Sequence, residues 1–250
     1  CDVAVDGKGN VLVAMQRGPQ TGAKATYAMH YHAATATWSP LVQVSPPGVN
    51  ALGIRMVRNA SRTAVWLLYT TQTSTGMWSH RWDEQTRTWS AAELVPDTAG
   101  IPLNFLTAEV PGQLNAVVDE QGEATVLWER LKTDPPLYTV HASRTVAGAR
   151  TAPTPLLPPA PASTRVTLAT ESIDVLPSGE VLGVVTRPVT SSFDQELMAV
   201  HFRPGEGWSS AKVFDVPGSS TTAPPIARCA FATANRAVAA AVNLLTLRSA

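Results

Sequence analysis

Histidine is the residue type whose spacing first suggests chemistry in this chain. Three of the five histidines, His30, His141 and His201, occupy one position of a repeated five-residue block, and Arg81 takes that position in the fourth copy. A zinc ion needs its ligands about 2 Å from a common point, and equivalent positions of separate repeats do not meet at such a point. We therefore expect no metal site and no cofactor. The repeated position is either a half-buried polar residue or a recurring ligand contact.

Aromatic and charged residues lie close to this repeated position. Ligand sites that orient a polar molecule combine an apolar, often aromatic, wall with a few charged or hydrogen-bonding groups. We therefore name as candidate ligand-binding residues His30, Arg81, Trp82, His141, His201, Trp128, Glu129 and Arg130, with Tyr31 and Phe202 as further aromatic candidates.

Three arginines share another position, at the end of the second strand of their repeats. They are Arg17, Arg130 and Arg187. A ring of like charges around a mouth attracts an anion. The same arginines could equally be solvated strand ends.

Acidic residues form no diagnostic catalytic pattern. Hydrolysis of a glycosidic bond needs two acidic groups, or a nucleophile with an acidic partner, facing one bond. The chain also lacks a Gly-rich phosphate loop, a nucleophile elbow and a His-Glu-x-x-His motif. We assign no catalytic residue, because no diagnostic spacing relates the candidates Glu93, Glu109, Asp119, Glu129, Glu171 and Asp174.

The two cysteines, Cys1 and Cys229, occupy the same position of the first and last repeats. In an oxidising compartment such a pair usually forms a disulfide, which here would close a ring. They could instead be two small buried residues, because stacked sheets lie about 10 Å apart and a bridge needs Cα atoms within about 7 Å. A lipid-modified Cys1 is a third reading, but a strand that begins at once argues against it.

The elements that position these residues form a repeat. A short apolar run, a tight polar turn and a second apolar run recur five times, over residues 1–16, 55–69, 115–129, 172–186 and 229–242. Gly and Asn in the turns supply positive φ angles, and Asp or Ser can hydrogen-bond the turn backbone. Such units, repeated at intervals of roughly 50 to 60 residues, are typical of a propeller blade. We place in register, directly after the turns, Val11, Thr63, Ala124, Val181 and Ala237.

A second block follows four of these units, over residues 27–31, 78–82, 138–142 and 198–202. Each alternates a large residue with a smaller or polar one, which is the pattern of a strand with two unlike faces. Three of the four then reach a tryptophan followed by serine, at Trp38, Trp89 and Trp208. The third unit lacks its tryptophan and has the Pro-rich stretch 153–161 nearby. We interpret these blocks as the third and fourth strands of each blade.

These units predict an all-β fold: a β-propeller of about five four-stranded blades in a single domain over residues 1–250. The repeats run over about 1–48, 49–100, 101–161, 162–220 and 221–250, and the last blade is incomplete in this chain. We expect a processed chain or a fragment, because the sequence has no initiator Met and only four outer strand pairs. The Ala-rich run 237–242 could instead be helical.

Charge and hydropathy limit the classes of partner that we expect. The chain has 19 basic and 19 acidic residues without a basic run, so nothing favours nucleic-acid binding. No apolar stretch reaches the roughly 18 residues needed to span a bilayer, so we expect no transmembrane segment.

Two turn-and-strand runs, 3–14 and 116–128, together with the blocks 80–82 and 88–90, resemble the repeats of secreted bacterial sialidase-like, or neuraminidase-repeat, propeller proteins. The resemblance implies a propeller fold and a secreted or cell-envelope location, with a signal peptide outside this chain. This sequence differs from that family in two of the family's motifs. Only fragments of the Ser-x-Asp-x-Gly-x-Thr-Trp box survive, as in residues 83–89, and the Arg-Ile-Pro motif is missing, since Ile101-Pro102 follows Gly100.

We therefore expect a non-enzymatic extracellular binding or scaffolding propeller, with a glycan or an extracellular protein as its partner. One alternative is a degenerate sialidase-like glycoside hydrolase. A second alternative is a structural module of a larger surface protein.

Overall fold

The computed structural model describes most of the chain, namely residues 1–19, 23–71, 76–96, 98, 115–133, 136–158, 160–161, 173–188, 195–214, 226–233 and 236–242. Side chains are described for all of these except 52, 129–133, 136–138, 160–161, 186–188, 195–197, 214, 226–233 and 236–242. The predicted domain bounds stay a prediction.

The described residues form β-strands and contain no helix, so the all-β prediction is confirmed for them. Two sheets come from the first part of the chain. The first sheet comprises β1 (Asp2–Val5), β2 (Val11–Arg17), β3 (Ala25–His32), β4 (Thr37–Trp38) and β5 (Val42–Gln43). The second sheet comprises β6 (Ala51–Arg58), β7 (Val65–Thr71), β8 (Met77–Asp83), β9 (Thr88–Trp89) and β10 (Glu93–Leu94).

Two further sheets and a hairpin follow. The third sheet comprises β11 (Asn115–Val118), β12 (Ala124–Thr133), β13 (Pro136–Val146), β14 (Ala149–Arg150), β15 (Thr154–Pro155) and β16 (Ala160–Pro161). The fourth comprises β17 (Ile173–Val175), β18 (Val181–Pro188), β19 (Gln195–Arg203), β20 (Gly207–Trp208) and β21 (Lys212–Phe214). A hairpin of β22 (Ile226–Thr233) and β23 (Arg236–Val242) ends the described chain. Because β23 is a strand, the helical alternative for the Ala-rich run is wrong.

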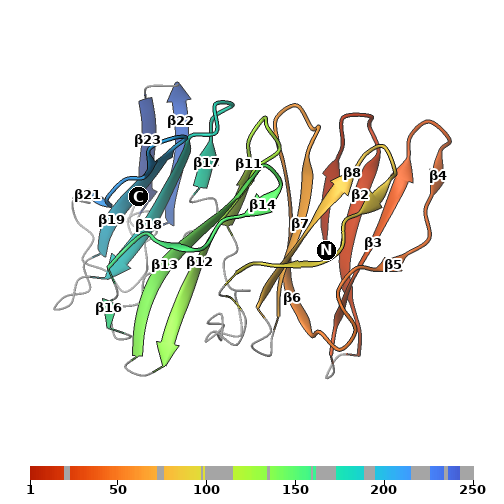
Figure 1. Cartoon of the computed structure of the whole chain (residues 1–250), viewed down its shortest axis with the longest axis horizontal. Helices are drawn as coiled ribbons and strands as arrows, with labels where there is room; N and C mark the ends of the chain where they lie inside the picture. The colour runs from red at the N-terminus through yellow and green to blue at the C-terminus, as the bar shows by residue number, and fades with distance from the viewer. Residues whose placement is uncertain are drawn as a thin grey trace, which may run out of the picture.

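Each of the four sheets has a blade-like order. Three antiparallel strands are followed by an outer strand that is broken into short pieces; in the first sheet both β4 and β5 pair with β3. The first strands contact one another in succession, β1 with β6, β6 with β11, β11 with β17 and β17 with β22. The sheets therefore stand side by side around their first strands, which is a propeller-like arrangement. Figure 1 shows the first sheet and the β22–β23 hairpin at opposite ends of the row. The predicted number of about five blades stays a prediction.

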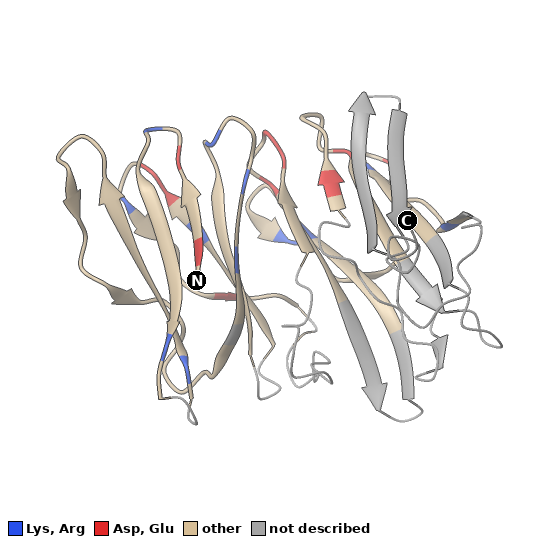
Figure 2. Ribbon diagram, turned by 180° about the vertical axis from the view of Figure 1, so that it is seen from behind, with Lys and Arg blue, Asp and Glu red and all other residues tan. Residues whose placement is uncertain are grey.

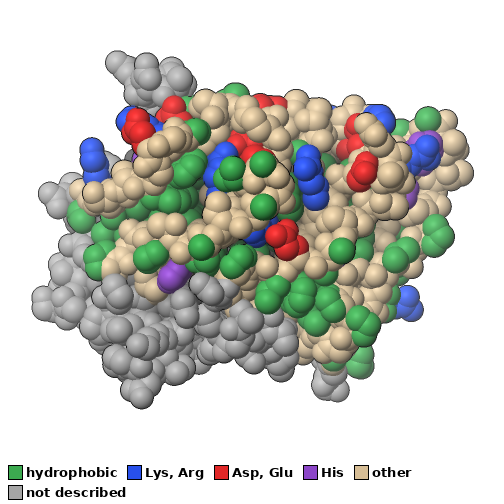
Figure 3. All heavy atoms as spheres, in the orientation of Figure 1, with side chains coloured by type: hydrophobic (Ala, Val, Ile, Leu, Met, Phe, Trp, Pro, Cys, Tyr) green, Lys and Arg blue, Asp and Glu red, His purple; other side chains and the backbone are tan. Residues whose placement is uncertain are grey.

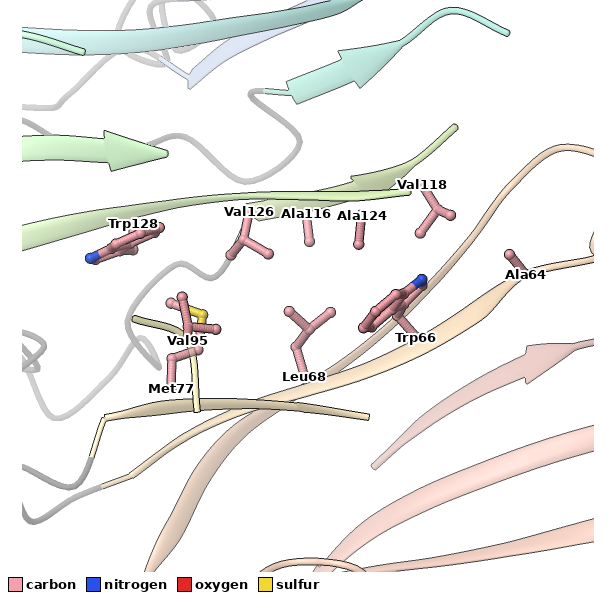
Figure 4. Close-up of a cluster of buried hydrophobic side chains, with 10 residues drawn as sticks. All are labelled: Ala64, Trp66, Leu68, Met77, Val95, Ala116, Val118, Ala124, Val126 and Trp128. Carbon is pink, nitrogen blue, oxygen red and sulfur yellow. The ribbon is translucent and has the colours of Figure 1, made fainter. Parts of the chain in front are cut away.

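Small and aliphatic side chains fill the space between neighbouring sheets. Between the second and third sheets, side chains of β7 and β8 face side chains of β11 and β12, as Figure 4 shows. Strands that are apolar on both faces suit this position, because each central sheet is covered on both sides. The buried members of this cluster are Ala64, Trp66, Leu68, Met77, Val95, Ala116, Val118, Ala124, Val126 and Trp128.

In the first and third sheets, one Asp side chain closes the turn between the first and second strands. Asp6 Oδ1 accepts hydrogen bonds from the backbone N–H groups of Lys8 at 3.0 Å and Asn10 at 2.9 Å. Asp119 Oδ1 repeats this with Gln121 at 3.0 Å and Glu123 at 2.9 Å. The predicted Asp-turn chemistry is therefore present in both.

Two of the predicted registers are wrong. The turn of the second sheet runs from Asn59 to Ala64, one residue longer than the Asp6–Asn10 turn. As a result Val65, not Thr63, is the equivalent of Val11. In the third sheet the repeated histidine position falls on Arg144 instead of His141, as the hydrogen bonds described below show.

One face of the first sheet is more exposed to solvent than the equivalent face of the other three sheets. The third residue after the turn and its partners on the two neighbouring strands form one row across each sheet. This row is buried in three sheets. Its members are Met56, Leu67 and His80 in the second sheet, Ala116, Val126 and Ser143 in the third, and Ile173, Gly183 and Val200 in the fourth. The equivalent row of the first sheet is Val3, Val13 and Met29, in which Val3 is 56% exposed and the other two are half-buried. The face that a preceding sheet covers elsewhere is therefore open here.

Charged residues concentrate at one edge of the row. Figure 2 shows most of the coloured Lys, Arg, Asp and Glu segments at the edge that holds the turns between first and second strands. In the space-filling view of Figure 3 the charged side chains likewise gather in the upper half of the face, with apolar side chains between and below them. Among the described residues, no helix is long and apolar enough to cross a membrane.

Candidate functional site

One hydrogen-bond pattern identifies the repeated position in all four sheets. The backbone N–H of the residue at this position donates to a hydroxyl on the outer strand segment, and its carbonyl accepts the N–H of that same hydroxyl residue. The pairs are His30 with Ser39 (3.0 Å), Arg81 with Ser90 (3.0 Å), Arg144 with Thr151 (3.1 Å) and His201 with Ser209 (3.1 Å). Arg150–Thr151 thus stands where the other sheets have Trp–Ser.

These four residues lie in four different sheets, so they form no common site. Two of them instead contact the sheet that follows. The His30 ring lies 5.1 Å, between centroids, from the ring of Trp82 in the second sheet. The Arg144 guanidinium lies 4.9 Å from the ring centroid of Phe202 in the fourth. In the first and third sheets the repeated position is therefore a contact with the next sheet.

The structure brings together some of the predicted site residues and separates others. His30 meets Trp82. His141 is buried and stacks on Trp128, with ring centroids 5.8 Å apart. His201 lies 3.0 Å from Glu180 through its Nε2 atom, in the fourth sheet. Arg81 is exposed.

Several predicted residues lie outside the described side chains: Glu129, Arg130 and Arg187. The arginine ring that includes the exposed Arg17 therefore stays a prediction. Cys1 is exposed and is a free cysteine, while Cys229 lies on β22 with its side chain among those not described. A disulfide would require the two ends of the row to meet (Figure 1), and it stays a prediction.

A groove of about 320 Å³ opens where His30 meets Trp82, between the outer strands of the first and second sheets. We call it the interblade groove. Its volume lies at the lower end of the range for small-molecule sites. Trp89 is half-buried and tilts against Trp82, with ring centroids 5.2 Å apart. The lining residues are Ala28, Met29, His30, Ser39, Pro40, Val42, Gln43, Val44, His80, Trp82, Arg87, Thr88, Trp89, Ser90, Ala91 and Ala92.

Most polar side chains of the groove are already hydrogen-bonded within the protein. Ser39 and Ser90 donate to the next backbone carbonyl, at 3.2 and 3.0 Å. His80 Nδ1 donates to the Ser90 carbonyl at 2.9 Å. Trp82 Nε1 donates to Asp6 Oδ2 at 3.1 Å. Gln43 and Thr88 also have side-chain partners.

Three polar side chains of the groove remain. Among the described residues, no side-chain hydrogen bond or ion pair engages the His30 imidazole, the Arg87 guanidinium or the Trp89 indole N–H. The groove therefore combines an apolar wall with three groups free to meet a ligand.

The surroundings of His30 favour its neutral form. Partial burial is the largest cause that lowers the pKa of His30, and the positive charges of Arg87 and His32 lower it further, while Asp6 opposes them. Neutral imidazole can both donate and accept a hydrogen bond, which suits a hydroxyl ligand.

A second cavity, of about 450 Å³, lies along the first strands of the second, third and fourth sheets. Asp119, Glu120 and Asp174 line it. The Asp119 carboxylate is buried and pairs with Arg144. A side-chain hydrogen bond with Ser61 is the largest cause that lowers the pKa of Glu120. Since a glycosidase acid needs a raised pKa, this arrangement does not make Glu120 a general acid.

Two groove residues escaped the sequence prediction. The sequence singles out Trp89 only as part of a Trp–Ser pair after the repeated block, and that pair is the signal available for it. Arg87 has a left-handed backbone, with φ of 57°, but nothing in its sequence context distinguishes it from a solvated turn residue.

No family model matches this sequence, and no curated protein matches it. Among solved structures, the polysaccharide lyase Uly1 aligns with a TM-score of 0.52 and 11% identity, over 96% of this chain and 65% of that chain. An endo-arabinase from Bacteroides thetaiotaomicron aligns with a TM-score of 0.41 and 12% identity, over 86% of this chain and 73% of that chain. An alpha-L-arabinanase from Penicillium chrysogenum aligns with a TM-score of 0.44 and 10% identity, over 86% and 64% of the two chains.

The chain thus spans less than two thirds of the length of Uly1 and of the Penicillium enzyme. At this identity the likeness to Uly1 shows a shared fold and nothing about chemistry. The chain therefore forms an all-β domain with a propeller-like fold.

Proposed function

We propose that this domain is a non-enzymatic binding module of a secreted or cell-envelope protein, and that it binds a saccharide in the interblade groove. The observation that carries the proposal is the set of three unengaged groups, His30, Arg87 and Trp89, around one groove with an aromatic wall. Sugars present apolar ring faces and many hydroxyls, so they suit an aromatic surface flanked by hydrogen-bonding groups.

The similarity to Uly1 supports this choice, because Uly1 is a polysaccharide lyase and so acts on a carbohydrate. The sialidase-like resemblance of the repeats agrees with a carbohydrate ligand.

A degenerate glycoside hydrolase is the alternative, and it would use the cavity lined by Asp119, Glu120 and Asp174. Binding is favoured over hydrolysis because the Asp119 carboxylate is engaged by Arg144 and by its own turn. The pKa of Glu120 is lowered instead of raised.

A glycan array combined with a fluorogenic sialoside assay tests the proposal. We expect binding to at least one saccharide class without turnover. Turnover that is lost in Glu120→Gln or Asp174→Asn would support the hydrolase instead. No binding and no turnover by the folded domain would favour a structural module of a larger surface protein.

Trp89→Ala tests the location of the site. It should weaken binding about tenfold or more, as loss of a buried aromatic anchor does. Trp38→Ala is the matched control, because Trp38 holds the equivalent position in the first sheet, tilts against Tyr31 at 5.3 Å and does not line the groove.

A further inference from the structure

The charge of the interblade groove is one-sided. Its lining residues include one arginine and two histidines but no aspartate or glutamate. A bound group with negative charge would therefore meet no like charge from the lining residues themselves.

Asp83 and Glu84, which lie close to Arg87 along the chain, and Asp6, which contacts Trp82, are already engaged. Asp83 Oδ1 accepts the backbone N–H groups of Gln85 at 2.8 Å and Thr86 at 3.1 Å. Glu84 accepts the Lys8 N–H at 3.0 Å and lies 3.7 Å from the Lys8 Nζ atom. Asp6 accepts from Lys8, Asn10 and Trp82. None of them forms an ion pair with Arg87 among the described residues.

The backbone fixes Arg87 at the rim of the groove. Its N–H donates to the Asp83 carbonyl at 2.8 Å, which closes the turn between β8 and β9. Its left-handed φ of 57° is a conformation that side-chain-bearing residues adopt less readily. The turn thus sets the starting point of a long, charged side chain beside the half-buried Trp89.

From this arrangement we infer that the saccharide bound in the groove carries an anionic group, a carboxylate or a sulfate ester, which pairs with the Arg87 guanidinium. The inference rests on the proposed function and names its ligand class. A guanidinium binds a carboxylate or a sulfate through two parallel hydrogen bonds, which gives both energy and orientation. The sugar ring then lies against the aromatic wall, within reach of the Trp89 N–H and the His30 imidazole.

The titration of His30 gives a second, independent test of anion binding. Arg87 and His32 lower its pKa, burial lowers it more, and Asp6 raises it. Trp82 is the aromatic ring that contacts His30, and His80 is a further titratable residue of the same groove. An anion that neutralises Arg87 removes one of these lowering causes, so binding should move the His30 titration to higher pH.

The experiment compares charged and neutral forms of the same sugar. The probes are a galacturonate oligosaccharide, its fully methyl-esterified form, and a sulfated and an unsulfated galactan oligosaccharide, each titrated calorimetrically into the domain. We expect the charged member of at least one pair to bind about tenfold or more tightly than its neutral partner. The pair that shows the difference distinguishes a carboxylate from a sulfate.

Arg87→Gln should abolish that difference, because the charged sugar should lose about tenfold or more in affinity, whereas the neutral sugar has no anionic group to pair with Arg87 and should lose less. Arg62→Gln is the control, because Arg62 also stands in a left-handed turn position, with φ of 63°, is exposed and lies outside the groove lining. Far-ultraviolet circular dichroism checks that both variants fold.

The outcomes separate the two proposals. Equal binding of charged and neutral sugars, with loss in Trp89→Ala, would overturn the anionic inference and leave the saccharide site in place. A charge preference that survives Arg87→Gln, or falls equally in Arg62→Gln, would also overturn it. Failure of every probe and of the wider array to bind would overturn both.

Discussion

The Trp82 indole N–H donates to Asp6 Oδ2 at 3.1 Å and so joins the second sheet to the turn of the first. The same carboxylate oxygen also accepts the Asn10 side-chain amide at 2.8 Å. Because both residues are buried, the bond is shielded from water, and it holds the aromatic wall of the groove against the adjoining turn.

Trp82→Phe should therefore destabilise the domain by about 1–3 kcal/mol, the cost of removing one partner from a buried hydrogen bond. Urea unfolding followed by circular dichroism measures the change. Trp89→Phe is the comparison, since the Trp89 N–H has no partner among the described residues, and it should leave the free energy of unfolding within about 0.5 kcal/mol. Equal losses in both variants would contradict the assigned role of the Asp6 bond.

The open face of the first sheet can be tested with two identical substitutions. Val126 and Val13 hold the same register position, but Val126 is fully buried and Val13 is half-buried. Val126→Ala should cost about 2 kcal/mol or more through lost burial and a cavity. Val13→Ala should cost less than half as much. If the two losses in unfolding free energy are equal, the first sheet is covered in solution.

The Asp119–Arg144 pair links a turn to the repeated position within the third sheet. Arg144 also donates to the Gly179 carbonyl at 3.0 Å, which reaches the fourth sheet. Asp119→Asn keeps an acceptor for the turn but leaves the buried guanidinium without a counter-ion, so we expect a loss of about 3–5 kcal/mol.

The double variant Asp119→Asn/Arg144→Met should recover part of that loss, because it removes the uncompensated charge. Thermal melting of the single and double variants measures the coupling. Additive losses would show that the two side chains do not interact.

Gly122 marks a close approach between the second and third sheets. Its φ is 79°, a Cβ there would lie 3.1 Å from the Ala64 Cβ, and its carbonyl accepts the Trp66 indole N–H at 3.1 Å. Gly122→Ala combines backbone strain with a steric contact, so the melting temperature should fall by several degrees. In Gly148→Ala, where φ is also positive but nothing lies within 4 Å of the added Cβ, the decrease should be smaller.

Stability should also depend on pH through His80. Burial is the main cause that lowers the pKa of His80, against a smaller opposing effect of its hydrogen bond to the Ser90 carbonyl. Between its folded pKa and the usual value of 6.5, the unfolded chain binds more protons than the folded one. The contribution of neutral His80 to the free energy of unfolding is therefore fully present above pH 6.5, and it is lost as the pH falls below that value. His80→Gln should reduce the change in melting temperature between pH 7.5 and 5.5. If the melting temperature of the variant changes with pH as steeply as that of the wild type, this assignment is contradicted.

The fold could be predicted from local sequence because its repeat is local. Turn residues such as Asp6 and Asp119 and the apolar runs around them determine the hairpins, and the Trp–Ser pairs indicate the outer strands. The register of the third sheet was predicted wrongly because Arg150–Thr151 replaces Trp–Ser there, so that His141 offered a false match where Arg144 belongs.

The groove could be predicted only in part. His30 and Trp82 were both named, but their contact joins residues of two different sheets, and no spacing along the chain encodes how sheets pack against each other. Trp128 and His141 have the same residue types and proved to be buried packing partners. Arg87 gave no sequence signal because its importance depends on which neighbouring acids are already engaged.

Calorimetric titration of the array's best saccharide into the wild-type domain, Trp89→Ala and Trp38→Ala tests the central claim most directly. The account predicts that wild type and Trp38→Ala bind alike and that Trp89→Ala binds about tenfold more weakly or worse. Equal binding by all three folded proteins would contradict the interblade groove as the saccharide site.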